Sequence, residues 1–267
     1  GYNVEISEID VSPLQIQGPK SLALMADLIG PAIHDIPYYG LLEGKIAGRD
    51  VVVSQSGFSG EKGYEIYLRD ATLHAEDLWN EVLEDGKKHS LMVIAPAHHR
   101  RIAAGILSWG QDLDFETLPF QCNLGYQVPR NKKSNYVGKE ALETARRQME
   151  GGQPPFKTIL VGMVFGGKPV DDYAPDFWLI SGPEGGDAVG YVTSPWYSPE
   201  LDTNIAMGYV PWGMHAIGTR LKINLPDEYA ETRGLPVMAE VVEIPFRPSV
   251  NPSARELARV DGRGAAL

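Results

Sequence analysis

Apolar side chains recur with a helical period in four parts of the chain. In residues 21–29 they fall on one face, between Ser21 as a candidate N-cap and Gly30 as a stop signal. The same period predicts three further helices, over residues 72–85, 96–109 and 139–149.

Short β-branched or alternating runs predict strands elsewhere. Residues 45–70 are typical of a hairpin region, with turn material at residues 56–60 and a strand that resumes from Tyr64 to Leu68. Further strands are predicted over residues 2–7, 13–17, 91–94, 126–128, 158–165, 188–194, 204–210, 219–224 and 237–244.

A change of character at residues 151–155, Gly-Gly-Gln-Pro-Pro, indicates a linker. Helices and strands alternate before it, whereas short strands separated by Gly and Pro turns follow it. We therefore predict an α+β domain over residues 1–150 and a small all-β domain, a barrel or a sandwich, over residues 151–267.

Composition narrows the class of protein. Hydrophobic residues make up 43% of the chain and charged residues 22%, so a folded core is expected. A net charge of -11 without a basic run disfavours nucleic acid, and the absence of a long apolar run disfavours a membrane span. The single cysteine, Cys122, is interpreted as a core thiol, and one cysteine fits a reducing, cytoplasmic location.

Candidate chemistry is concentrated in residues 56–67. Strand alternation places Tyr64 and Ile66 on one face and Glu65 and Tyr67 on the other. If the first face meets the core, a carboxylate and a phenol project together toward a ligand. A carboxylate can accept two parallel hydrogen bonds from the amino group and adjacent ring nitrogen of a pterin. The alternative is an exposed pair on a solvated hairpin.

Six blocks of sequence resemble, in order and spacing, the family of the glycine cleavage T-protein and dimethylsulfoniopropionate demethylase. The resemblance spans roughly residues 4–245 and implies a folate-binding α+β domain followed by a small C-terminal β-barrel. Its blocks are Val11 to Lys20, Ser56 to Tyr67, Leu107 to Asp112, Thr117 to Gly125, Tyr136 to Leu142 and Ser194 to Val210.

Within the family, three blocks look closest to the demethylases: residues 10–14, 105–110 and 197–200. Two features point the other way. Gly60-Glu61 follows the T-protein form, and Phe58 stands where the demethylases have Trp.

The resemblance also implies roles for single residues in a site for tetrahydrofolate. Glu65 would anchor the pterin, Tyr67 would line the site near the methyl donor, and Phe58 would pack on the ligand. Arg101 would reach the benzoyl-glutamate tail, although the acidic residue of that family motif is Ala103 here.

Two aromatic residues are further candidates. Trp109 could stack on a ligand ring, and the alternative for it is a core position. Tyr197 could contact the substrate, whereas packing in the barrel is the favoured explanation for it. His98 and His99 are adjacent and would point about 100° apart on a helix, so we predict no metal site there.

The family's central catalytic acid is matched by no block of this sequence. It lies in the N-terminal half of the family, and the chain starts with a strand-like segment that lacks Met. The resemblance therefore implies that an N-terminal half or a partner chain supplies that acid, or that the site is incomplete.

The implied activity is transfer of a methyl group to tetrahydrofolate from a small-molecule donor. A sulfonium such as dimethylsulfoniopropionate suits this chemistry because its leaving group departs neutral, and N- or O-methyl donors are further options. The alternatives are an aminomethyltransferase of the glycine cleavage system and a folate-binding module without catalysis of its own.

Overall fold

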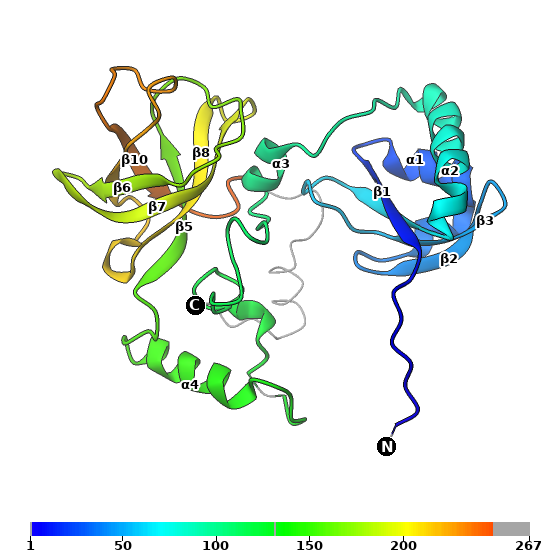
Figure 1. The fold of residues 1–267 in the computed structure, drawn as a ribbon, viewed down its shortest axis with the longest axis horizontal. Coiled ribbons are helices and arrows are strands. Elements are labelled where there is room, and N and C mark those ends of the chain that lie inside the picture. Colours follow the sequence, from blue (N-terminus) through cyan, green and yellow to red (C-terminus); the bar gives the residue numbers. More distant parts are fainter. Residues whose placement is uncertain (1, 131, 248–267) are drawn as a thin grey trace. The chain divides into compact units, whose positions relative to one another are not determined.

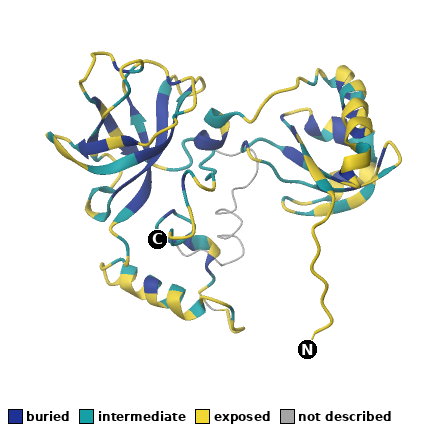
Figure 2. Cartoon of the chain, in the orientation of Figure 1, coloured by how far each residue is buried: buried dark blue, intermediate teal, exposed yellow. Residues whose placement is uncertain are grey.

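The computed structural model describes residues 2–130 and 132–247. Contacts group them into two compact units, one within Gly1–Ala97 and the other within His98–Leu267. Each unit has its own buried core, drawn in dark blue in Figure 2.

The first unit is a four-stranded antiparallel sheet with two helices. Along the chain its elements are β1 (Val11–Gln17), α1 (Ser21–Ile29), η1 (Pro31–Asp35), β2 (Leu41–Ile46), β3 (Arg49–Ser54), β4 (Gly63–Arg69), α2 (Ala71–Gly86) and η2 (Lys87–His89). The strand order is β1-β4-β3-β2, so β4, the last strand in sequence, lies between β1 and β3.

Helices α1 and α2 cover one face of this sheet (Figure 1). The covered face buries alternate residues of the strands, such as Ile16, Val53 and Ile66, against Leu24 of α1 and Leu78 of α2. Strand alternation leaves the intervening residues on the opposite face, which α1 and α2 leave uncovered.

Predicted elements of the first unit are largely confirmed, with three corrections. Ser21 is the first residue of α1 and not its N-cap, because its hydroxyl donates to the Lys62 carbonyl at 3.0 Å. Residues 2–7 and 91–94 were predicted as strands and form none. Alternating apolar residues need a partner strand to become part of a sheet, and neither segment pairs with one among the described residues.

The second unit places three short elements before a β-barrel. The elements are α3 (His98–Ala103), η3 (Gly125–Gln127), α4 (Lys139–Glu150), β5 (Thr158–Phe165), β6 (Trp178–Gly182), β7 (Gly185–Ser198), β8 (Thr203–Pro211), η4 (Trp212–Met214), β9 (Arg220–Ile223) and β10 (Val237–Val242). The six strands close in the order β10-β5-β8-β7-β6-β9.

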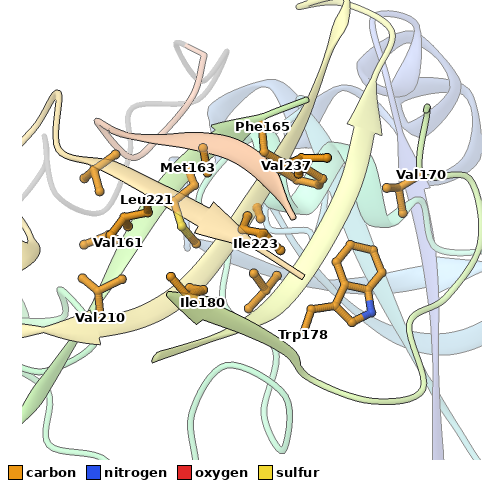
Figure 3. Close-up of a cluster of buried hydrophobic side chains, with 14 residues drawn as sticks. Val161, Met163, Phe165, Val170, Trp178, Ile180, Val210, Leu221, Ile223 and Val237 are labelled. Carbon is orange, nitrogen blue, oxygen red and sulfur yellow. The ribbon is translucent and has the colours of Figure 1, made fainter. Parts of the chain in front are cut away.

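Inward-pointing side chains fill the barrel. Figure 3 shows Val161, Met163, Ile180, Leu221 and Ile223 converging on its interior. Each alternates along its strand with residues that point outward, as a closed sheet requires. The predicted α+β domain followed by a β-barrel is confirmed. Of the two predicted forms of the all-β domain, a barrel and a sandwich, the closed sheet shows the barrel.

Helix α3 is shorter than predicted because Gly105 ends it. Gly105 has φ +68°, its N–H donates to Ile102 O at 2.9 Å, and the Ile106 N–H donates to Arg101 O at 2.8 Å. These two bonds form the Schellman arrangement that terminates many helices. The prediction of a helix over 96–109 is therefore wrong beyond residue 103, and the strand predicted at 126–128 is the 3₁₀ turn η3.

The compact units divide at residues 97 and 98, whereas the predicted domain limits were residues 150 and 151. Residues 98–112 belong with the barrel because Ile102 and Ala103 pack in one cluster with Leu160, Ile205 and Met207. The limits of the family's domains at 1–150 and 151–267 stay a prediction.

Candidate functional site

Strand β4 presents Glu65 and Tyr67 on the face of its sheet opposite the helices. Tyr64 and Ile66 are fully buried on the helix side, so the predicted alternation is confirmed. Both Glu65 and Tyr67 are only half-buried, and a ligand can approach them. Cross-strand neighbours on the same face are Gln15 and Ser54, each directly opposite Glu65.

The carboxylate of Glu65 is held by two hydroxyl groups through a single oxygen. Ser56 Oγ donates to Glu65 Oε2, and Tyr67 Oη donates to the same oxygen at 3.2 Å. Within the described part of the chain, no donor is hydrogen-bonded to Oε1. The second oxygen thus keeps its two lone pairs for a donor that comes from outside the unit.

The phenol of Tyr67 stays protonated near neutral pH and can therefore donate a hydrogen bond. Burial, followed by the neighbouring negative charge of Glu65, raises the pKa of Tyr67 above its ordinary value of 10.0. Because ionisation would place a second negative charge beside the carboxylate, the protonated phenol is favoured.

The β3–β4 loop, residues 55–62, carries Ser56 and Phe58 beside this pair. Phe58 is 38% exposed, so its ring offers apolar surface to solvent or to a ligand. The sequence predicted turn material at residues 56–60, and the family resemblance implied that Phe58 packs on the ligand, but neither gave Ser56 a role. The role of Ser56 was missed, since only the folded loop returns its hydroxyl to Glu65, nine residues further on.

Arg101 lies in the second unit, where its guanidinium is 1% exposed. Nη1 donates to Asp112 Oδ2 at 2.8 Å and to Ile106 O at 3.1 Å, and Nη2 donates to Ser194 Oγ at 2.8 Å and Gln111 Oε1 at 3.0 Å. Burial lowers the pKa of Arg101, and the Asp112 carboxylate opposes that effect.

Asp112 is as deeply buried as its partner and collects further donors. Its Oδ1 accepts from Thr193 Oγ1 and Ser194 Oγ, both at 2.6 Å, and its Oδ2 accepts from the Ser108 N–H at 2.8 Å. This network fastens the segment after α3 to strand β7. It was not anticipated from the sequence, and a role of Arg101 in cofactor binding stays a prediction.

Two other predicted site residues also belong to the second unit. Trp109 is 58% exposed and meets Phe115 edge-to-face, with ring centroids 4.8 Å apart, so it is a surface residue and not a core one. The Tyr197 hydroxyl donates to Asp202 Oδ1 at 2.5 Å. Neither arrangement tests the predicted contact with a ligand.

His98 stacks on Trp196, with ring centroids 5.3 Å apart, and burial lowers the pKa of both His98 and His99. No group of three or more metal-binding side chains occurs in the two stretches that the structure describes. Nor does any helix in those stretches have the length and apolar character of a membrane span.

Comparison with known proteins places these features in a family. Two family models match the chain: the GCVT N-terminal domain over residues 2–132, and the glycine cleavage T-protein C-terminal barrel domain over residues 160–246.

Individual relatives agree with these models. The dimethylsulfoniopropionate demethylase DmdA of Ruegeria pomeroyi is 34% identical over 85% of this chain and 59% of its own length. An aminomethyltransferase of Saccharopolyspora erythraea is 31% identical over 91% of this chain and 62% of its own.

A solved structure shares the fold. The glycine cleavage system aminomethyltransferase T of Bartonella henselae superposes with a TM-score of 0.73 and 26% identity, over 90% of this chain and 61% of that one. The chain thus spans about three fifths of the length of these relatives. With two matching models and relatives above 30% identity, the chain belongs to the family of the glycine cleavage T-protein and dimethylsulfoniopropionate demethylase.

Proposed function

We propose that this chain forms the tetrahydrofolate-binding part and C-terminal barrel of a one-carbon transferase, and that the enzyme is a demethylase. The observation that carries the proposal is the open oxygen of Glu65, on a strand inside the region matched by the GCVT N-terminal model. The identity to the Ruegeria demethylase supports the choice of reaction.

The residues of this site fit a reduced folate. The pterin ring has an amino group and an adjacent ring N–H that donate side by side, and Glu65 Oε1 offers an acceptor that no described residue uses. Ser56 and Tyr67 hold the other oxygen, so the carboxylate is oriented before the ligand arrives. Phe58 supplies an aromatic surface two residues from Ser56.

Bound tetrahydrofolate supplies the nucleophilic nitrogen that accepts the one-carbon unit. The residues of the chain bind and orient. Glu65 fixes the pterin edge, and Tyr67 holds its proton on the phenolic oxygen. Transfer from a sulfonium needs chiefly alignment of the two reactants and exclusion of water, because the donor carries its own leaving group. That requirement matches a site built from a carboxylate, hydroxyls and an aromatic ring.

A second candidate is aminomethyl transfer. Gly60-Glu61 has the T-protein form, and the similar Bartonella structure is an aminomethyltransferase. We rank it second because the Ruegeria demethylase is the more similar of the two curated relatives compared above, and because three blocks resemble the demethylases.

Turnover is proposed to need more than these 267 residues. The family's catalytic acid is matched by no block of the sequence. We therefore expect the acid to come from an N-terminal half or from a separate chain. The measurement is demethylation by the 267-residue chain with and without that polypeptide.

The test of function is product identification. The intact protein is incubated with tetrahydrofolate and either dimethylsulfoniopropionate or an aminomethyl donor on a lipoyl group, and the folate product is identified by mass spectrometry. Methyltetrahydrofolate with a thioether supports demethylation, whereas methylenetetrahydrofolate with ammonia overturns it in favour of the second candidate. Folate binding without either product would leave a binding module, and an absence of binding at millimolar ligand would contradict the proposal as a whole.

A further inference from the structure

The side chain of Gln17 lies between two glycines at the edge of the candidate site. Gln17 ends β1 and pairs with Gly63, the first residue of β4. A Cβ at Gly63 would lie 2.2 Å from Gln17 Nε2, and a Cβ at Gly57 would lie 2.3 Å from the same atom. Real Cβ atoms do not approach so closely, so the amide occupies space that only glycine leaves open on both sides.

This side chain lies on the same face of the sheet as Glu65. Directly opposed residues of an antiparallel pair project to one face, and Gly63 shares its face with Glu65, two residues further along β4. Gln17 therefore stands next to the carboxylate along the open face, on the side where the β3–β4 loop begins and ends.

A hydrogen bond fastens the middle of the loop to Gln17. Ser59 Oγ donates to Gln17 Oε1, and the Glu61 N–H donates to Ser59 Oγ at 3.2 Å. Gly57 and Ser59 flank Phe58 in sequence, so contacts with one glutamine fix both neighbours of that ring.

Both ends of the loop are tied to the backbone independently. Gln55 N donates to Gly40 O at 3.1 Å at one end, and Lys62 O accepts from Gly18 N at 2.9 Å at the other. The segment between them holds Ser56 and Phe58, and the side chain of Gln17 on β1 meets it at Gly57 and Ser59.

We propose that Gln17 is a positioning residue of the folate site, acting through the β3–β4 loop. By holding Gly57 and Ser59 it sets where Ser56 meets Glu65 and where the Phe58 ring stands. It does not itself touch the reacting groups. This proposal rests on the proposed function for its consequence in binding, but its structural part stands without it.

The experiment compares Gln17→Met, Ser59→Ala and Glu65→Gln with the unchanged protein. Gln17→Met keeps an unbranched chain between the glycines but cannot accept from Ser59, and Ser59→Ala removes the same bond from the other partner. Gln15→Met is the matched control for loop exchange, because Gln15 is on the same strand and face but exposed. Amide hydrogen exchange of residues 55–62 is measured, with the β2–β3 turn at Ala47 and Gly48 as internal reference.

Loss of one neutral hydrogen bond should raise loop exchange about fivefold in Gln17→Met, and at least as much in Ser59→Ala, which also loses the bond from the Glu61 N–H. No change is expected at the reference turn or in Gln15→Met. Tetrahydrofolate affinity, measured by titration calorimetry, should fall about 3- to 10-fold in both variants. Unchanged loop exchange in both would overturn the proposal, as would faster exchange together with unaltered affinity. If the unchanged protein and Glu65→Gln both fail to bind folate, the proposed function fails, and the exchange data still decide whether Gln17 anchors the loop.

Discussion

The Tyr67 hydroxyl donates a 3.2 Å hydrogen bond to the carboxylate of Glu65, two residues before it on the same face of β4. Strand geometry alone brings the two side chains to one side, and Ser56 from the preceding loop completes the set. A carboxylate held in this way has little freedom left to lose on binding, so its open oxygen, Oε1, is pre-organised to accept from a ligand.

Substitution of Glu65 tests the anchor itself. Glu65→Gln keeps the shape but replaces one acceptor oxygen with a donor that would face the donors of the pterin. Loss of a hydrogen bond to a charged group costs about 1.5–3 kcal/mol, so tetrahydrofolate affinity should fall about 10- to 150-fold in calorimetry. Glu43→Gln is the control, because Glu43 is exposed on β2 and pairs with Arg69. Equal affinities in the two variants would remove Glu65 from the site.

Tyr67→Phe isolates the contribution of the phenol. The variant keeps the ring but leaves Glu65 with one hydroxyl donor, so the carboxylate is less well oriented. We expect affinity for tetrahydrofolate to fall about 3- to 10-fold at pH 7, as for one neutral donor lost. Because Tyr67 stays protonated well above neutral pH, the ratio between the two proteins should be constant from pH 6 to pH 9. A ratio that changes across this range would show that another group sets the orientation.

The neighbouring Tyr64 provides the matched comparison on the opposite face. Its hydroxyl is buried and has no hydrogen-bond partner among the described residues. Tyr64→Phe removes an unpaired polar group, and relief of that burial cost should raise the free energy of unfolding by about 1–2 kcal/mol. Folate affinity should not change. Urea denaturation measures the effect, and destabilisation would reveal a partner for this hydroxyl that the structure does not show.

The two faces of β4 could be predicted from the sequence because side-chain alternation is a local property of a strand. The end of α3 could also have been predicted, because glycine often ends helices and Gly105 follows Ala103 closely, but the helical period continues past Gly105 to Trp109. Periodicity shows which residues suit a helix, and it does not show that a single glycine ends the helix.

The surroundings of Arg101 could not be predicted in the same way. Asp112 is 11 residues away, but Ser194, the third member of the network, is 93 residues away on β7. Only closure of the barrel brings that strand beside α3. The same reason explains why Gln17 and Ser59, 42 residues apart, were not singled out, although both lie in blocks that carry the family resemblance.

Disruption of the Arg101–Asp112 pair should be costly for the second unit. Asp112→Asn leaves a buried guanidinium without its counter-charge, which typically costs about 3–5 kcal/mol of stability. Asp50→Asn is the control, because its ion pair with Lys45 is exposed and should contribute little that can be measured. Guanidinium denaturation of both variants gives the comparison. A small effect of Asp112→Asn would mean that water or a ligand reaches the guanidinium.

Burial of the Cys122 thiol should make the free energy of unfolding fall at alkaline pH. Burial raises the pKa of this thiol from 9.0 to about 11, so the folded state favours the protonated form more strongly than the unfolded state does. Below pH 9 both states are protonated and nothing is lost. Between pH 9 and pH 11 the unfolded state ionises first, and the free energy of unfolding must fall, by about 2 kcal/mol between pH 8 and pH 10.5.

The experiment must separate this effect from that of tyrosines with raised pKa values, whose ionisation lowers the free energy of unfolding in the same pH range. The effect of the thiol is therefore taken as the difference between the unchanged protein and Cys122→Ala, measured by urea denaturation. The variant will have a constant offset from its small cavity, but a shallower decline with pH. Parallel declines in the two proteins would show that the thiol is already accessible to water in the folded state.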